Sequence, residues 1–146
     1  MPRQTFPCVK ASAIDYLVDA GPIVGLLSET DQWHAWSHSV LTVLDVQLAT
    51  TEMVWGEICH LLRKDRVALF AAIEALETGR IVLLPVWGHV SRIRILIEKY
   101  PQMDAGDASL VVPSELHPKA KIITTDVRDF TVYRRFRNEA LPLIHP

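Results

Sequence analysis

The chain has 146 residues, and 49% of them are hydrophobic, which suits a single domain with a substantial core. Its formal net charge of −2 argues against a surface that attracts nucleic acid by a broad basic field, although a bound cation can supply positive charge at one place. The sequence has no apolar run of about 18 residues, so we expect no membrane span. Two cysteines without CxxC spacing make a disulfide framework unexpected and the cytoplasm the predicted location.

The chain divides into a short N-terminal leader, residues 1–13, and a single domain, residues 14–146. The domain begins with a short apolar strand over residues 14–18, and Asp19 follows this strand directly. Functional sites of open α/β sheets lie beyond the carboxyl ends of the strands, so Asp19 stands where a catalytic acid would stand. Aspartate is also a good helix N-cap, and a helix is expected from residue 23, so a purely structural role is equally open.

A helix over residues 31–44 and a short strand over residues 47–50 follow. Thr51 is then a good N-cap for a helix that reaches Lys64. Glu57 lies at the rim of the apolar stripe of this helix, where a carboxylate reaches either solvent or a cation. The stripe is predicted to consist of Val54, Ile58, Leu61 and Leu62.

The middle of the chain continues the alternation of helices and strands. Asp65 is placed to cap a helix that ends near Gly79, and residues 80–84 form an apolar strand typical of a buried parallel sheet. A helix over residues 87–100 comes next, and we expect Arg92 and Arg94 on its solvated side. Its buried stripe is predicted to be Val90, Ile93 and Ile97.

Two pairs of aspartates with the same spacing mark the stretch from Tyr100 to Arg134. Asp104 and Asp107 open a predicted helix, in which Pro113 should cause a kink or an end. Asp126 and Asp129 follow a predicted strand over residues 119–125. Helix capping and the helix macrodipole explain one acid of the first pair well and two less well. Carboxylates that converge repel one another unless a cation lies between them, and Mg²⁺ and Mn²⁺ take such oxygen ligands.

The last part of the chain is predicted to hold a short helical turn over residues 132–136 and an edge strand over residues 141–144. Taken together, the alternating strands and helices predict an α/β fold with a mostly parallel central sheet and helices on both faces.

The order and spacing of these acids resemble those of the PIN-domain ribonucleases, and within them the VapC-type toxins of bacterial toxin–antitoxin systems. The resemblance covers roughly residues 14–146, and Pro113 and the long leader depart from the family pattern without touching an acid. The matching segments are LVDAGPIVGLL, TTEMVWGEICHLL, MDAGDASLVV and IITTDVRDFTVYR.

The resemblance implies a PIN-like fold and a metal-dependent endoribonuclease that hydrolyses RNA with an activated water. It also implies one or two Mg²⁺ or Mn²⁺ ions per site, an antitoxin protein as partner, and a homodimer. The ions would be bound by Asp19, Glu57, Asp107 and Asp126, with Asp104 and Asp129 as supporting acids.

Contacts to the substrate are less sharply indicated by the sequence. Arg63, Arg128 and Arg134 are possible phosphate-binding residues, although each also fits a solvated charged surface. Trp87 and Tyr133 fit either base stacking or core packing. Two other functions stay open, a metal-dependent phosphatase on an α/β sheet and a catalytically silent binding module of the same fold. The phosphatase is disfavoured because LVDAGP lacks the second aspartate of a DxD signature.

Overall fold

The fold is known from a computed structural model, which describes residues 13–146. Five short strands lie in this part of the chain. They are β1 (Tyr16–Val18), β2 (Leu48–Thr51), β3 (Ile81–Leu84), β4 (Lys121–Ile123) and β5 (Leu143–Ile144). They form one sheet with the order β3-β2-β1-β4-β5, and each neighbouring pair is parallel. The predicted parallel sheet is therefore confirmed, including the edge position of the last strand.

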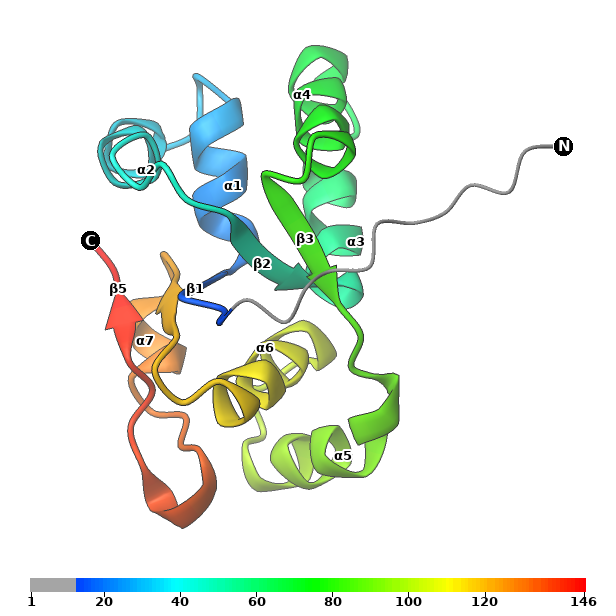
Figure 1. The fold of residues 1–146 in the computed structure, drawn as a ribbon, viewed down its shortest axis with the longest axis vertical. Helices are drawn as coiled ribbons and strands as arrows, with labels where there is room; N and C mark the ends of the chain where they lie inside the picture. The colour runs from blue at the N-terminus through cyan, green and yellow to red at the C-terminus, as the bar shows by residue number, and fades with distance from the viewer. Residues whose placement is uncertain (1–12) are drawn as a thin grey trace, which may run out of the picture.

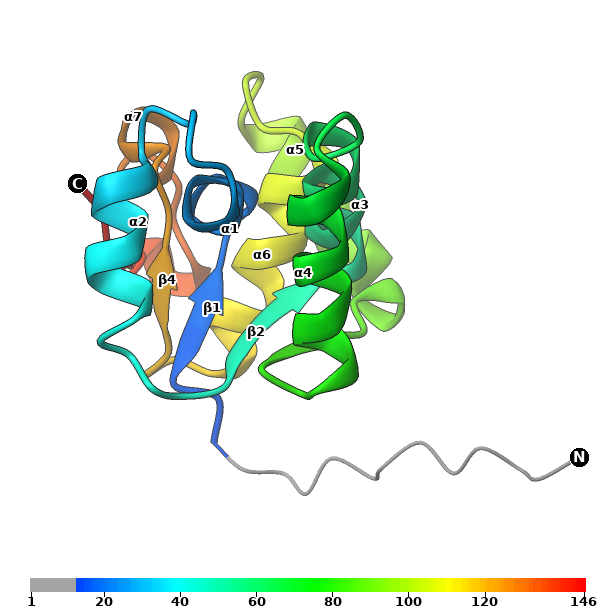
Figure 2. The same ribbon diagram turned by 90° about the horizontal axis from the view of Figure 1, so that it is seen from above.

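Helices cover both faces of this sheet. The α-helices are α1 (Ala20–Leu27), α2 (His34–Leu41), α3 (Glu52–Leu61), α4 (Arg66–Glu77), α5 (Val90–Lys99), α6 (Ala105–Leu116) and α7 (Val127–Phe130), and short 3₁₀ helices are η1 (Trp87–His89) and η2 (Phe136–Asn138). Helices α1 to α4 lie on one side of the sheet, and α5 and α6 lie on the other (Figure 1). The view from above shows α1 and α2 beside β1 and β4, with α5 and α6 behind (Figure 2). The α/β architecture is thus confirmed.

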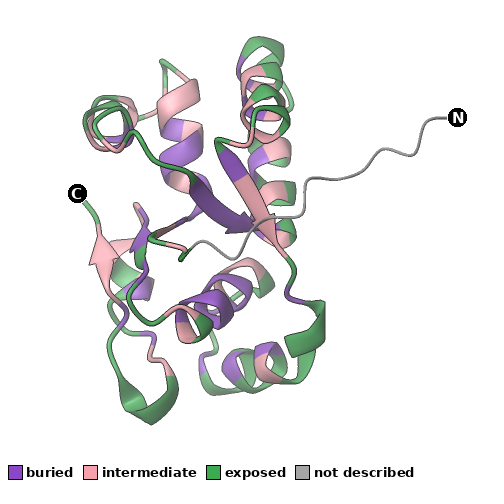
Figure 3. Cartoon of the chain, viewed as in Figure 1, coloured by how far each residue is buried: buried purple, intermediate pink, exposed green. Residues whose placement is uncertain are grey.

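The hydrophobic core follows the two central strands and α6. Leu17 and Val18 of β1 are fully buried, as are Ile122 and Ile123 of the neighbouring β4. In α6, every residue from position 108 to position 114 is buried (Figure 3). This helix is packed between the sheet and α5, so its N-terminus is held firmly at one edge of the sheet. Burial on both faces explains why the strands read as continuous apolar runs in the sequence.

The register of β1 and β4 brings distant parts of the sequence together. Val18 is paired with Ile123, and the backbone N–H of Asp19 donates to the Ile123 carbonyl at 2.9 Å. Both strands end at this level, and a helix follows each of them, α1 after β1 and α7 after β4. The residues that follow β1 and β4 therefore lie next to each other at the carboxyl edge of the sheet.

Two predicted buried stripes are partly wrong. In α5, Ile93 is buried as expected, but Val90 and Ile97 are 55% and 37% exposed, while Leu96 is buried. The buried face of α5 is set by its contact with α6, and the sequence alone does not show where that neighbour lies. In α3, Val54, Ile58 and Leu62 are buried, but Leu61 is 49% exposed.

The region from Pro113 onward differs from the prediction in three ways. Helix α6 does not end at Pro113 but continues to Leu116, because Pro113 and its preceding turn are held in the core by tertiary packing. A short helix, α7, begins directly after Asp126 where none was predicted. The helical turn expected over residues 132–136 is instead a 3₁₀ turn at Phe136–Asn138.

Two further expectations concern the whole chain. Residues 1–12, which make up nearly all of the predicted leader, lie outside the described residues. Within residues 13–146, no helix has both the length and the apolar character needed to cross a membrane.

Candidate active site

Six carboxylates line one cavity at the carboxyl edge of the sheet. The cavity has a volume of about 270 Å³ and lies where the N-terminal ends of α1, α6 and α7 meet α3. The structure thus brings together the four predicted ligands and the two predicted supporting acids. They are Asp19, Glu57, Asp104, Asp107, Asp126 and Asp129.

Asp19 is both the helix cap and a cavity acid, so the two roles that the sequence left open are combined. One carboxylate oxygen accepts a hydrogen bond from the Ala20 backbone N–H at 2.8 Å. The other accepts from the Thr124 hydroxyl at 2.8 Å. Burial raises the pKa of Asp19 to about 6, with smaller contributions from the negative charges of Glu57 and Asp126, although both hydrogen bonds act in the opposite direction.

The two aspartate pairs use one capping arrangement twice. Asp104 is the N-cap of α6, and its carboxylate accepts from the Asp107 backbone N–H at 2.8 Å. Asp126 is the N-cap of α7 and accepts from the Asp129 backbone N–H at 3.1 Å. Capping therefore accounts for the equal spacing of the two pairs. It does not account for their meeting in one cavity, which the sheet imposes.

Glu57 enters the cavity from α3, opposite the start of α6. Its pKa is raised by partial desolvation, and the charges of Asp104 and Asp107 add to this effect. The two helices are close together at this point. A Cβ atom on Gly106 would lie 3.2 Å from the Asp104 Oδ1 atom and 3.7 Å from the Glu57 Oε2 atom. A glycine at position 106 therefore leaves room for the acids on either side.

Asp107 is tied to a residue that the sequence did not assign to the site. The hydroxyl of Tyr133 donates to Asp107 Oδ2 at 2.8 Å. Burial raises the pKa of Asp107 to about 7, with Asp104, Asp19 and Asp126 adding to it, and the hydrogen bond from Tyr133 lowers it. Tyr133 is fully buried, so base stacking is wrong for this residue and core packing is correct. Burial also raises the pKa of Tyr133, and the bond to Asp107 adds to the rise.

Thr124 is a second residue that sequence reasoning missed. Its hydroxyl donates to Asp19 and accepts from the Asp126 backbone N–H at 3.0 Å, so it links the ends of β1 and β4. Its position two residues before Asp126 is a local signal that could have pointed to it. Tyr133 has no such signal, because its contact with Asp107 spans 26 positions and depends on tertiary packing.

None of the three predicted phosphate-binding arginines lines the cavity. Among the described residues, its lining contains no lysine or arginine. Arg63 and Arg128 are exposed to solvent. The Arg134 guanidinium donates to the backbone carbonyls of Thr131, Val132 and Tyr133, at 2.7 to 3.2 Å. Arg134 is therefore engaged at the end of α7 and is the least suited of the three to bind a phosphate.

The donor chemistry of the cavity fits a hard divalent cation. Carboxylate oxygens are the ligands that Mg²⁺ and Mn²⁺ prefer, and six carboxylates lie here without a basic neighbour among the described lining residues. The positions shown do not by themselves form an ion site. Within residues 13–146, no group of three or more His, Cys, Asp or Glu side chains is arranged so that it could hold a metal ion.

The chain is similar in fold to solved structures of known proteins. No family model and no curated protein matches the sequence. Among solved structures, VapC20 of Mycobacterium tuberculosis, described as a sarcin-ricin loop cleaving toxin, matches with a TM-score of 0.61 and 15% sequence identity. The match covers 74% of this chain and 87% of VapC20. The chain has a PIN-like fold.

A second solved structure supports this fold. A toxin–antitoxin complex from Klebsiella pneumoniae matches with a TM-score of 0.65 and 19% identity, over 88% of this chain and 98% of that one. At such low identities the likeness establishes the PIN-like fold alone. In this PIN-like fold the acidic cavity lies at the carboxyl ends of parallel strands, where open α/β sheets place their sites.

Proposed function

We propose that the protein is a metal-dependent endoribonuclease and the toxin of a toxin–antitoxin pair. The observation that carries the proposal is the convergence of six carboxylates, from four separate parts of the chain, on one cavity with no basic residue in its described lining. Such a cluster raises the pKa values of its own acids, as for Asp19 and Asp107, and is costly for stability without a cation. Strain of this kind is typical of functional sites.

In this proposal Asp19, Glu57, Asp107 and Asp126 bind Mg²⁺ or Mn²⁺, and Asp104 and Asp129 support them. When bound, such a cation supplies positive charge beside the phosphodiester and favours a water as nucleophile. The protein contributes carboxylates that the fold brings to one cavity. Asp19 is held by two hydrogen bonds and by its place at the end of a buried strand, so its carboxylate has little freedom to turn away.

The toxin part of the proposal is supported by the two structural matches, one described as a toxin and the other as a toxin–antitoxin complex. One of them is a complex with an antitoxin, which supports an antitoxin protein as the partner of this chain. A direct test is to induce the wild-type protein and Asp19→Asn separately in a bacterial host. Growth arrest by the wild type alone is expected, and arrest by both the wild type and Asp19→Asn would argue against a toxic nuclease.

The decisive experiment is cleavage of a mixed cellular RNA pool with Mg²⁺, with Mn²⁺ and with EDTA. We expect discrete cuts that depend on the metal and fall by about 100-fold or more in Asp19→Asn, since one ligand of the cation is lost. Asp65→Asn is the matched control. Asp65 is also a helix N-cap, accepting from the Ala68 N–H at 3.0 Å, but it lies outside the cavity.

The outcomes separate the proposed nuclease from its alternatives. Equal cleavage by wild type and Asp19→Asn would contradict the assignment of the site. Turnover of phosphomonoesters without RNA cleavage would favour a phosphatase. Folded protein that does neither with either metal would favour a binding module of the same fold.

A further inference from the structure

The hydroxyl of Tyr133 is held at Asp107 by a fixed aromatic ring. The Tyr133 side chain is fully buried. Its ring meets the Tyr100 ring edge-on with a centroid distance of 5.2 Å, and meets the Phe130 ring in the same way at 5.3 Å. Such packing leaves the ring one position. The hydroxyl is therefore directed at Asp107 Oδ2, 2.8 Å away, by the core rather than by the cavity.

We propose that Tyr133 is a positioning residue that orients the Asp107 carboxylate for the cation. This inference rests on the proposed metal-dependent nuclease and names a residue that acts through one of its ligands. Tyr133 does not line the cavity, so any effect on the cation passes through Asp107. Because Tyr133 occupies one lone-pair direction on Oδ2, the rest of the carboxylate is left to face the cavity.

The backbone of Asp107 is fixed as well, which makes the side-chain torsions the remaining freedom. Its N–H is bound by the Asp104 carboxylate, and it lies in the first turn of a helix whose next residues are buried. Its side chain has like charges around it, from Asp104, Asp19 and Asp126. Repulsion from these charges would turn a free carboxylate away from the cavity. The bond from Tyr133 opposes that rotation.

A simpler explanation is that a buried hydroxyl needs a partner and Asp107 is the nearest acceptor. The two explanations differ in what happens to metal affinity. Tyr133→Phe removes the hydroxyl and keeps the ring. Tyr100→Phe is the matched control, because Tyr100 belongs to the same aromatic cluster and its hydroxyl has no hydrogen-bond partner among residues 13–146.

The test is calorimetric titration of Mn²⁺ into the metal-free wild type, Tyr133→Phe and Tyr100→Phe, without RNA. We expect the dissociation constant for Mn²⁺ to rise about 10- to 100-fold in Tyr133→Phe, as is usual when a partner of a metal ligand is removed. Tyr100→Phe should bind as the wild type does. A purely structural role would leave the Mn²⁺ affinity of Tyr133→Phe unchanged, and that result would overturn the inference while the proposed function stands.

The wild type supplies two further readouts. If it neither binds Mn²⁺ nor cuts RNA, the proposed function fails and the inference fails with it. A second measurement does not depend on the folding of any variant. The buried hydroxyl proton of Tyr133 should give a slowly exchanging NMR signal that shifts when Mg²⁺ is added, and a signal that Mg²⁺ leaves in place would overturn the inference.

Discussion

The acidic residues at the two ends of helix α6 have opposite electrostatic surroundings. At the N-terminal end, Asp104 and Asp107 meet other carboxylates in the cavity and no described arginine or lysine. At the C-terminal end, the side chain of Glu115 is only 3% exposed, and Arg92 binds it through two nitrogens, the shorter contact being 2.9 Å. Helix α6 therefore has a neutralised end, where Arg92 pairs with Glu115, and a strained end, where Asp104 and Asp107 have no described basic partner.

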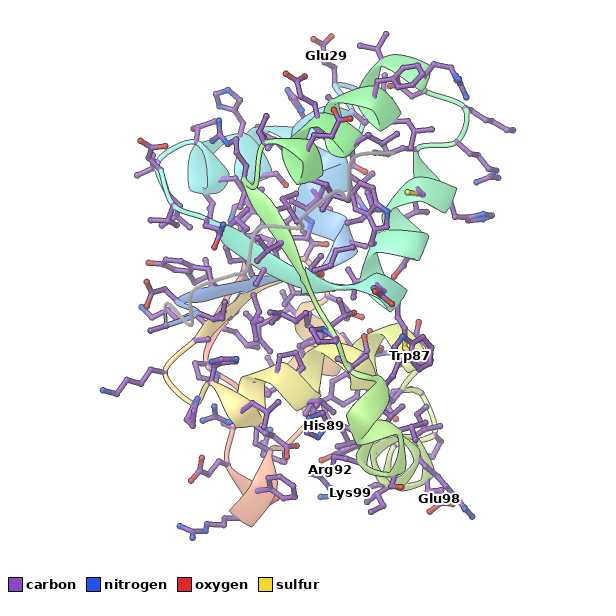
Figure 4. The ribbon with its side chains drawn as sticks, turned by 45° about the vertical axis from the view of Figure 1, so that its right-hand side comes forward. Glu29, Trp87, His89, Arg92, Glu98 and Lys99 are labelled. Carbon is purple, nitrogen blue, oxygen red and sulfur yellow. The ribbon has the colours of Figure 1, made fainter. Side chains whose placement is uncertain are left out.

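The neutralised end is built by several contacts that act together. The prediction that Arg92 is solvated is wrong. The Arg92 side chain is only 21% exposed, and its guanidinium lies 4.1 Å from the centre of the Phe136 ring. Figure 4 shows Arg92 on the side of α5 toward the C-terminal segment, whereas Glu98 points outward. Arg135 adds hydrogen bonds to the Ser114 and Pro118 carbonyls. Glu115 thus has a guanidinium partner, whereas the carboxylates of the cavity have no arginine or lysine among the described lining residues.

The largest expected effect is a loss of stability when the ion pair at the neutralised end of α6 is broken. Arg92→Met leaves Glu115 buried without a partner, so the free energy of unfolding should fall by about 3–5 kcal/mol. Urea denaturation measures this change. Arg94→Met is the control, because the Arg94 side chain is 80% exposed, and a change within about 0.5 kcal/mol is expected there. Equal losses in the two variants would remove the contrast between the ends of α6.

Binding of a cation at the strained end should stabilise the protein. At a Mn²⁺ concentration 100 times the dissociation constant, the protein should gain about 2.7 kcal/mol of stability. For a chain of this size that gain raises Tm by roughly 5–10 °C. Asp126→Asn should show a smaller rise. A Tm indifferent to millimolar Mn²⁺ would show that the cavity does not bind the metal.

The strained end should also make the metal-free protein less stable as pH rises. The pKa values of Asp19 and Asp107 are raised to about 6 and about 7, above the value of 3.8 expected in an unfolded chain. The folded state therefore holds protons more tightly. Its stability from these acids is fully present below pH 4 and is lost as pH rises through 6 and 7.

Asp107→Asn should flatten this pH dependence by on the order of 1 kcal/mol, a figure reduced for the screening of a partly exposed group. Urea denaturation at pH 5 and pH 8 in EDTA measures the difference. If the variant lost as much stability as the wild type between these pH values, Asp107 would not be one of the strained groups.

The smallest expected effect concerns RNA binding outside the cavity. Arg128 is exposed on α7, two residues after Asp126, and is the best placed of the three predicted phosphate contacts. Arg128→Ala should weaken RNA binding by less than about 10-fold and lower the slope of log affinity against log salt by about 1. Binding measured at several salt concentrations tests this. An unchanged slope would exclude Arg128 as a phosphate contact.

The part of the site that follows strand ends could be predicted from the sequence. Asp19 comes directly after β1, and Asp126 comes soon after β4, and both strands are visible as short apolar runs. Parallel strands end at a common edge, so local patterns were enough to predict that these acids would meet. The same reasoning placed Asp104 and Asp107 at a helix start.

The remaining features of the fold and the site depend on contacts between residues that are distant in the sequence, which no local pattern predicts. The buried face of α5 is set by α6, so Val90 and Ile97 were wrongly placed in the core. Helix α6 continues past Pro113 because its tertiary packing outweighs the lost backbone donor. The bond from Tyr133 to Asp107 joins two elements through the core. In each case the deciding contact is distant in sequence.

The hydrogen bond from Thr124 to Asp19 has a consequence for the timing of synthesis. The two residues are 105 positions apart in the sequence. At the usual rate of roughly 5–20 residues per second, a ribosome needs roughly 5–20 s to advance from one to the other. The edge strand β5 is made later still, because it follows Thr124 in the sequence. A growing chain therefore lacks the assembled cavity until the residues after β4 have been made, and the proposed nuclease would become active only after that point.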